Sequence, residues 1–270
     1  MPLRKHALKD MTFVEFRERL AESPVVLLPF GSQEEQGPHA PMGDFMLTER
    51  LSVLAAEAAD AIAAPTVPFG YADFFRTVPG GVQLRAETFS AVLEDTVTAF
   101  LDHGIEHLVV FNGHSSNAPL IDQTLRRLRR QRGVAVAALN IWRLIPPELW
   151  RELHGDKASQ ARGHGGDPLT SVYLHLFPEL MRPDLVRPAT PSQAFGLPTD
   201  GVAAVSFEGL PVQMPLDVTE VNPDGMLGGD PTLADAAIGA RIVEHIVGFT
   251  ARFVAHFHRC DPRRVETAPA

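Results

Sequence analysis

The sequence predicts an α/β fold in which helices cover both faces of a mostly parallel sheet. Two observations support this class. Short apolar runs with the composition of buried strands alternate along the chain with longer segments whose apolar residues recur at helical spacing. Polar, glycine-rich loops follow directly after two of the predicted strands, where open α/β sheets bind their ligands.

The first half of the chain supplies two predicted strands and two predicted helices. "PVVLLPF" (24–30) is apolar, rich in β-branched residues and bounded by proline, which is typical of a buried strand. "MLTERLSVLAAEAADAI" (46–62) has apolar residues at helical spacing, and "APTVPF" (64–69) is a second short strand. The amphipathic segment 86–104 predicts a helix that ends at Gly104.

The second half continues the alternation. "HLVVFN" (107–112) and "VAVAALNIW" (134–142) are predicted strands, and the segment between them (119–133) predicts a helix that begins at a proline and ends at a glycine. A long helix over 231–257 closes the fold. The stretch 187–201 is the one long irregular segment, and in a single domain such a stretch is usually a functional loop or a cover.

Composition excludes several classes of protein. The 270 residues are 45% apolar with mean hydropathy near zero, which indicates a globular chain with a sizeable core. The formal charge of −9 argues against a nucleic-acid partner, and the basic run 126–132 is typical of a solvated helix end. We find no linker and no internal repeat, so we expect one domain over 1–270.

The same composition bears on location. A single cysteine, Cys260, excludes a disulfide framework within the chain and fits a reducing cytosol. The N-terminal segment lacks the apolar stretch of a signal peptide. No run approaches the roughly 18 apolar residues of a membrane span. We therefore expect a cytoplasmic protein with no membrane partner.

Two polar loops follow predicted strands and should meet at one edge of the sheet. "GSQEEQGPHAPMGDF" (31–45) follows the first strand, and "NGHSSN" (112–117) follows the third. The carboxyl ends of parallel strands lie at the same edge, so side chains from both loops can converge there. The convergent set is Glu34, His39, Asp44 and His114.

A third polar cluster, "RGHGGDPLTS" (162–171), precedes a helical stretch at 169–177. It places His164 and Asp167 among glycines, which let the backbone approach a ligand closely. Carboxylate oxygen together with imidazole suits Zn, Mn or divalent Fe. A structural zinc site would usually use cysteines, which these loops lack.

Less specific explanations exist for each residue. A histidine beside glycine is more often a hydrogen-bonding loop residue than a ligand. Asp44 could instead cap the N-terminus of the helix that begins near Phe45. Three polar, glycine-rich loops placed together after strands favour a functional site over these separate explanations.

Four segments together resemble, in order, the signatures of the creatininase family of metal-dependent amidohydrolases. These segments are "GSQEEQGPHAPMGD", "FNGHSSN", "GHGGDPLTS" and "GMLGGDPTLADAAIG", and "VPGGVQLRAETF" resembles the segment between the first two. The likeness covers roughly residues 24–250. It implies a three-layer α/β/α sandwich with a two-metal site.

The resemblance assigns roles by position. Glu34 and His114 match metal ligands, and Asp44 matches the bridging aspartate if one residue is deleted before it. His39 matches the second histidine of the first motif. His164 matches the histidine taken to act as acid and base near the substrate, and Glu35 is a further catalytic candidate.

The chain also departs from the family pattern. Gln36 stands where the first histidine ligand is expected, Ser116 where creatininase itself carries a glutamate, and Leu169 where many relatives carry a glutamate. Amide and hydroxyl groups are poor replacements for imidazole and carboxylate. We therefore expect one firm metal site and a doubtful second one. Additional ligands or substrate contacts could come from Gln36, His39, Ser116 and Asp167.

The function that the resemblance implies is metal-dependent hydrolysis of a C–N bond in a small cyclic amide. Two alternatives remain open. The same scaffold could hydrolyse a lactone or a formamide, or the protein could be a non-catalytic relative that binds a ligand. The expected cofactor is Zn or Mn, with Fe as a further option. The expected partners are a small-molecule substrate and further copies of the chain, with a hexamer favoured.

Overall fold

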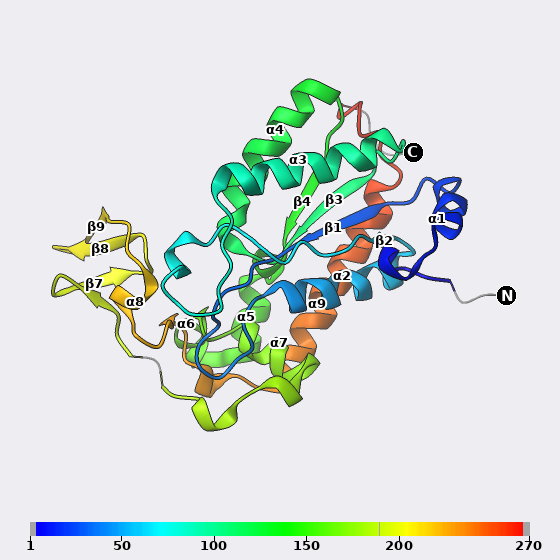
Figure 1. Ribbon diagram of the computed structural model, residues 1–270. Coiled ribbons are helices and arrows are strands. Elements are labelled where there is room, and N and C mark those ends of the chain that lie inside the picture. The colour runs from blue at the N-terminus through cyan, green and yellow to red at the C-terminus, as the bar shows by residue number, and fades with distance from the viewer. Residues whose placement is uncertain (1–3, 189, 267–270) are drawn as a thin grey trace.

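The computed structural model describes residues 4–188 and 190–266, and a parallel sheet lies at its centre (Figure 1). The strand order is β2-β1-β3-β4, and each neighbouring pair runs parallel. This confirms the predicted mixed α/β class with a mostly parallel central sheet. The four strands are β1 (Val26–Phe30), β2 (Ile62–Ala63), β3 (Leu108–Asn112) and β4 (Ala137–Asn140).

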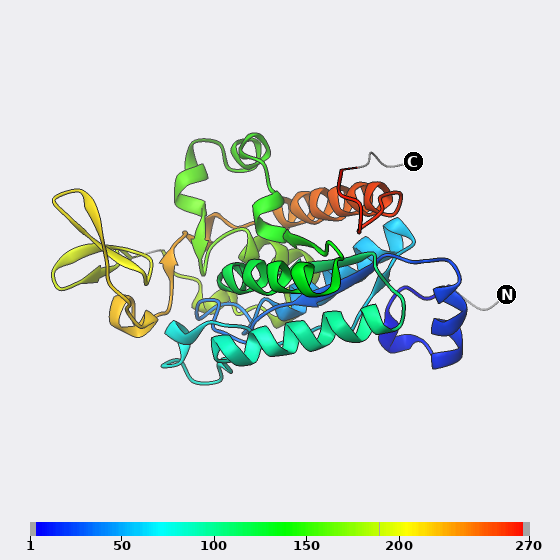
Figure 2. The same ribbon diagram turned by 90° about the horizontal axis from the view of Figure 1, so that it is seen from above.

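Helices cover both faces of this sheet (Figures 1 and 2). Successive strand residues point to opposite faces, so Val26 and Leu28 contribute to one apolar core while Leu27 contributes to the other. All three are essentially inaccessible to water, and burying a side chain of this size stabilises the fold by about 1.5–3 kcal/mol. The covering helices are α3 (Ala86–Asp102) and α4 (Ala118–Arg132) on the Val26 face, and α2 (Phe45–Ala59), α7 (Leu169–Leu176) and α9 (Ala236–Phe257) on the Leu27 face.

Shorter elements complete the described chain. α1 (Phe13–Leu20) begins with a capping box between Thr12 and Glu15. No helix within residues 4–188 and 190–266 combines the length and apolar character needed to cross a bilayer. The remaining helices are α5 (Pro147–His154), α6 (Ala158–Ala161) and α8 (Val218–Val221).

Several predicted boundaries were wrong. The strand expected at 64–69 is β2 at Ile62–Ala63, and only Val67 returns to the sheet, through an isolated bridge to Phe30. Pro65 and Pro68 explain the interruption, because proline has no N–H to donate to a ladder.

The helix expected at 46–62 ends earlier, at Ala59. Asp60 then adopts a left-handed conformation (φ 52°) that stops the helix. The final helix likewise starts at Ala236 rather than 231, because the Asp235 side chain accepts a hydrogen bond from the Ala237 N–H and caps it there.

The segment expected to be irregular at 187–201 belongs in part to a second, antiparallel sheet. This sheet projects from the end of the molecule beyond the carboxyl ends of β1 and β3 (Figures 1 and 2). Tight turns at Gly196, Gly201 and Gly209, all with positive φ, connect its strands. The strands are β6 (Gln193–Ala194), β7 (Leu197–Asp200), β8 (Ala204–Phe207) and β9 (Leu210–Gln213).

Candidate metal centre

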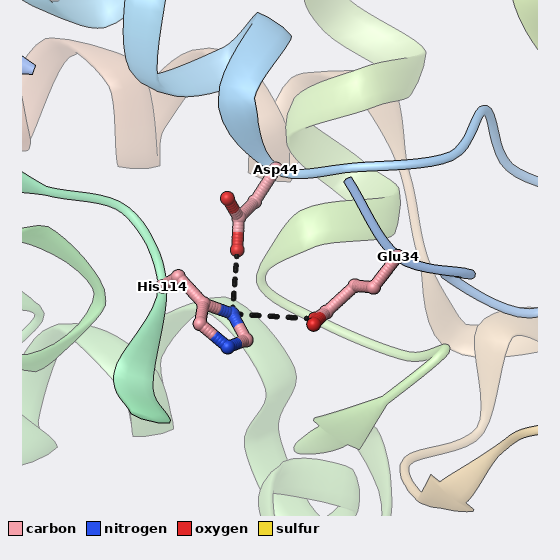
Figure 3. Close-up of side chains that lie close together, drawn as sticks. All are labelled: Glu34, Asp44 and His114. Atoms are coloured by element: carbon pink, nitrogen blue, oxygen red, sulfur yellow. Dashed lines mark hydrogen bonds and ion pairs between the residues drawn. The ribbon is translucent and has the colours of Figure 1, made fainter. Parts of the chain in front are cut away.

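Three acidic and imidazole side chains meet at the carboxyl edge of the central sheet (Figure 3). Glu34 and Asp44 lie in the loop after β1, and His114 follows β3. Phe30 and Asn112 pair at the ends of these two strands, which brings the loops to the same level. One potential ligand atom from each side chain lies within 4.8 Å of the others, and all three residues are buried.

His114 is the centre of this cluster. Its Nδ1 atom lies 3.1 Å from Asp44 Oδ2 and 3.3 Å from Glu34 Oε1. Its Nε2 lies 3.2 Å from the carbonyl oxygen of Tyr71, which can only accept, so Nε2 carries the proton in that bond. With Nε2 donating to that carbonyl, Nδ1 is the nitrogen that faces the carboxylates, and it is the one that would offer its lone pair to a bound metal. Burial lowers its pKa, but the two carboxylates outweigh burial and raise the pKa well above the usual range.

Asp44 occupies the position that begins α2, yet its side chain makes no capping hydrogen bond. Instead Oδ1 accepts from the Ser32 N–H (2.7 Å), and Oδ2 accepts from the Ser32 hydroxyl (3.1 Å). Burial raises the pKa of Asp44 to about 6, although His114 opposes the shift. The carboxylate is thus turned away from the helix and toward His114.

Only one of the two carboxylate oxygens of Glu34 accepts a hydrogen bond from the described residues. Oε1 accepts a hydrogen bond from the Gln36 amide at 3.1 Å. Oε2 is buried and has no hydrogen-bond partner among the described residues. A buried, unsatisfied carboxylate oxygen is costly, and a bound cation would satisfy it. The orphaned oxygen and the His114 tautomer both fit a divalent metal held by these three residues.

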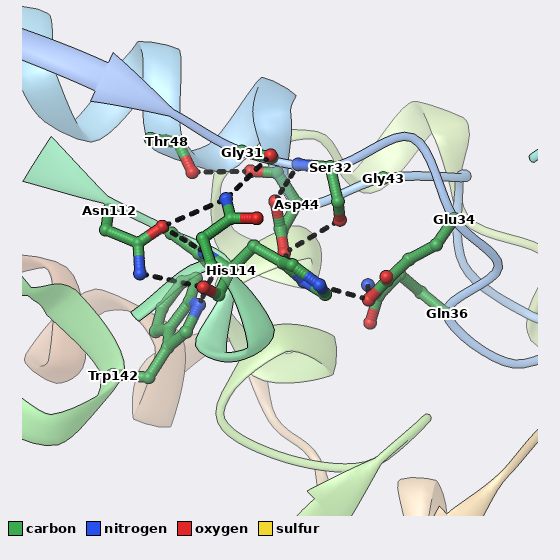
Figure 4. A network of polar contacts seen from close by, with 12 residues as sticks. Gly31, Ser32, Glu34, Gln36, Gly43, Asp44, Thr48, Asn112, His114 and Trp142 are labelled. Atoms are coloured by element: carbon green, nitrogen blue, oxygen red, sulfur yellow. Dashed lines mark hydrogen bonds and ion pairs between the residues drawn. The ribbon is translucent and has the colours of Figure 1, made fainter. Parts of the chain in front are cut away.

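Hydrogen bonds and close backbone contacts fix the loops that carry the cluster, and Figure 4 shows the polar contacts among them. A Cβ atom on Gly113 would lie 1.7 Å from the Thr48 hydroxyl, and a Cβ on Gly31 would lie 2.5 Å from Phe45 Cα. The Asn112 amide donates to the carbonyl of His114 (2.7 Å), and the Trp142 indole donates to that of Gly113 (2.5 Å). These contacts fix the ligand geometry in advance.

A second pair of polar side chains faces the cluster. His164 lies on β5 (Gly163–His164), which pairs with β10 (Leu227–Gly228) in a short antiparallel ribbon. Its Nε2 lies 2.8 Å from Glu35 Oε1, and Glu35 Oε2 accepts from the Gly37 N–H at 2.6 Å. The other ring nitrogen, Nδ1, is 3.9 Å from Glu34 Oε1. Burial lowers the pKa of His164, but the Glu35 carboxylate outweighs it and the pKa is raised.

The other predicted site residues lie outside the three-residue cluster. His39 is fully buried, and its Nε2 lies 3.2 Å from the Thr170 hydroxyl. Asp167 accepts hydrogen bonds from the N–H and hydroxyl of Ser171, and burial raises its pKa to about 6. That Glu34, Asp44 and His114 bind metal, and that His164 and Glu35 are catalytic, stay predictions.

A cavity of about 380 Å³ joins the cluster to His164. Sequence reasoning missed part of its wall, namely Phe75, Arg162 and the β7–β8 turn. Arg162 had one signal, because it precedes His164 by two residues and an extended chain turns such residues to the same side. Among the residues that line the cavity are Glu34, Gln36, Asp44, Phe75, His114, Ser116, Trp142, Arg162, His164, Asp167, Leu169 and Asp200–Ala203.

Comparisons with known proteins agree on one family. The family model described as creatinine amidohydrolase matches residues 9–254. The 3-dehydro-scyllo-inosose hydrolase of Thermotoga maritima is 26% identical over 64% of this chain and 57% of the relative, so the chain aligns with little more than half of that protein. The mycofactocin precursor peptide peptidase of Mycobacterium ulcerans is 27% identical over 83% of this chain and 82% of the relative.

Solved structures give the same result. A mutant creatininase of the Zn-Zn type and a manganese creatininase each superpose with a TM-score of 0.75 at 25% identity, covering 93% of this chain and 98% of theirs. A further creatininase reaches a TM-score of 0.78 at 24% identity, which bears on the fold alone.

Proposed function

This chain belongs to the creatininase family, and we propose that it is a metal-dependent hydrolase that cleaves a C–N bond of a small cyclic amide. The observation that carries the proposal is the buried Glu34–Asp44–His114 cluster with its orphaned Glu34 oxygen, which lines one cavity together with His164, the partner of Glu35. Relatives in this family include a hydrolase and a peptide peptidase, so hydrolysis is the common chemistry.

The donor set suits Zn or Mn, and the neighbouring creatininases include structures with each. Divalent Fe would also accept these ligands. When bound, such a cation lowers the pKa of a coordinated water and polarises the substrate carbonyl. We propose one firm site per chain, because Gln36 donates a hydrogen bond to Glu34 and Ser116 offers only a hydroxyl.

His164 is placed to move the proton that hydrolysis requires. The Glu35 carboxylate accepts from Nε2–H, which leaves Nδ1 facing the metal-binding cluster as a base. A proton taken there from the attacking water can then pass to the leaving nitrogen. Glu35 orients the ring and stabilises the imidazolium that forms in between.

The main alternatives to a cyclic amide are substrates with other hydrolysable carbonyl bonds. Water attack on a polarised carbonyl would serve a lactone, a formamide or, as in the mycobacterial relatives, a peptide. A non-catalytic ligand-binding role is opposed by a cavity lined both by the buried Glu34–Asp44–His114 cluster and by His164, which Glu35 orients.

The test is to purify the protein without chelator or affinity metal, measure its metal content, and screen cyclic amides, lactones, formamides and short peptides. We expect about one tightly held equivalent of metal and hydrolysis of a cyclic amide. The variant Gln36→His/Ser116→Glu, which restores the family's ligand types, should raise the count toward two. Two dialysis-resistant equivalents in the wild type would contradict the single-site proposal, and a metal-free protein after incubation with Zn or Mn would favour the non-catalytic rival.

We further propose that the active form is a closed homo-oligomer, most simply a hexamer. Light scattering at micromolar concentration tests this, and a monomer would overturn it.

A further inference from the structure

Arg162 places a positive charge in the wall of the active-site cavity. Its guanidinium lies over the ring of Trp150, with Cζ 4.1 Å from the ring centroid. Trp150 is 5% exposed, and its indole N–H donates to the Ala158 carbonyl at 2.8 Å. A fixed aromatic surface therefore orients the guanidinium, which loses less entropy on binding a ligand than a free side chain would.

Within the part of the chain that the structure describes, this charge has no acidic partner. Among residues 4–188 and 190–266, no carboxylate lies within ion-pair distance of Arg162. Asp200 also lines the cavity but forms no such pair, and the Asp167 side chain is occupied by Ser171. Arg162 is exposed as a residue, so its guanidinium is open to a ligand, and the partial desolvation of that group lowers its pKa.

The position of Arg162 relates it to the reacting groups. It precedes His164 by two residues, so the Cα atoms lie about 6–7 Å apart in extended chain, and both side chains line the same cavity. A substrate whose carbonyl lies between His164 and the metal-binding cluster would extend a second group toward Arg162.

We propose that Arg162 binds a carboxylate on the substrate, which makes the substrate class a cyclic amide bearing a carboxylate side group. This inference rests on the proposed function. A guanidinium pairs with a carboxylate through two parallel N–H···O bonds. Among the described residues that line the cavity, Arg162 is the only arginine or lysine, which matches a singly charged carboxylate better than a doubly charged phosphate.

A matched pair of probes tests this: hydantoin-5-acetic acid and hydantoin-5-acetamide, which differ in charge but hardly in shape. Binding to the metal-loaded protein can be followed by intrinsic fluorescence. Of the two tryptophans, Trp142 lines the cavity and Trp150 lies beneath Arg162. We expect the acid to bind the wild type about tenfold to a hundredfold more tightly than the amide.

Three variants locate the effect. Arg162→Gln should bring the acid-to-amide ratio close to one, and Arg162→Lys should retain part of it. Arg151→Gln, which removes the same charge from the exposed face of α5, should leave the ratio unchanged. Metal content and circular dichroism check that each variant is folded.

Several outcomes would overturn the proposal. Equal binding of acid and amide, no binding of either, or a preference that persists in Arg162→Gln would each exclude this role for Arg162. Inorganic phosphate that displaces the acid more strongly than acetate does would assign the site to phosphate instead. Turnover is followed separately. A charge preference in binding without hydrolysis would support the Arg162 subsite and count against the proposed function. Equal binding and equal hydrolysis of both probes would support the proposed function and count against the subsite.

Discussion

The two halves of the candidate site rest on different parts of the fold. Glu34, Asp44 and His114 stand on loops that leave the central parallel sheet, where close glycine contacts exclude adjustment. His164 stands on the two-stranded β5–β10 ribbon, and its partner Glu35 reaches it from the first loop. The ribbon is short, whereas the sheet is packed on both faces.

This difference suggests a division of labour. A cation needs several charges held together against their mutual repulsion, and the rigid sheet edge supplies that support. A proton-transfer group needs one orienting partner and access to substrate, which the ribbon provides. Variants of the two halves should therefore fail in different ways.

The largest effect is expected from His114→Ala or Asp44→Ala. Each removes one of the three proposed ligands. His114→Ala leaves Glu34 and Asp44 without the imidazole between them, and Asp44→Ala leaves only Glu34 and His114, so bound metal and activity should both fall below detection. Elemental analysis and an assay on the same sample measure this. His245→Ala serves as the control, because among the described residues His245 bonds only the Leu144 carbonyl, and retained metal in His114→Ala would remove His114 from the ligand set.

The next largest effect is expected from His164→Ala, which should lower the rate by roughly 10²–10⁴-fold while metal content stays unchanged. Glu35→Gln should also lower the rate, but by a smaller factor, because the oxygen of the glutamine amide still accepts a hydrogen bond from His164 Nε2. If His164→Ala lost metal as well as activity, His164 would be a ligand, and the separation between a metal-binding half and a proton-transfer half would be wrong. An unchanged rate would leave His164 as a loop hydrogen-bonder.

A smaller effect is expected from His39→Ala. His39 touches Thr170 rather than the cluster, so its removal should weaken metal affinity by about 10–100-fold at most, as for residues that orient ligands. Competition with a fluorescent zinc chelator measures the affinity. If His39→Ala abolished binding, as Asp44→Ala should, His39 would have to be moved into the ligand set.

The last effect is expected on stability alone, not on metal binding, and it depends on pH. Folding raises the pKa of Asp167 from 3.8 to about 6, so its protonated form is favoured in the folded state. That contribution is full below pH 3.8 and is lost as pH rises through about 6, up to ~3 kcal/mol. Asp167→Asn keeps an acceptor for the Ser171 N–H and can donate from its NH2 group to the Ser171 hydroxyl oxygen, without the charge, so its free energy of unfolding relative to wild type should rise between pH 4.5 and 7. Urea titrations measure the free energy of unfolding of both proteins at each pH. A difference between them that did not change with pH would show that Asp167 titrates normally.

The convergence of the first two loops could be predicted because it follows from topology alone. Parallel strands end at the same edge, so residues just after β1 and β3 share that edge whatever their exact conformation, and the pairing of these two strands makes them neighbours. The partner of His164 could not be predicted in this way. Glu34 and Glu35 are adjacent in an irregular loop, where no periodicity says which carboxylate faces the cluster and which faces the ribbon.

The second sheet was missed for a related reason. Its strands are short and largely exposed, so they lack the apolar runs that identified the central sheet. Their turns bring Asp200 and Gly201 to the cavity from far along the chain. The role of Arg162 depends on Trp150, and only tertiary packing places the ring beneath the guanidinium.

Residue 44 also carries an evolutionary consequence. It begins α2, where an aspartate that caps the helix would contribute about 1 kcal/mol, yet its carboxylate is turned toward His114 instead. Selection for stability alone would not keep it in that orientation. On the proposal that Asp44 binds metal, the position exchanges stability for activity: a lineage without the chemistry would be free to regain the cap, so a capping side chain here would be an early sign of a relative released from catalysis.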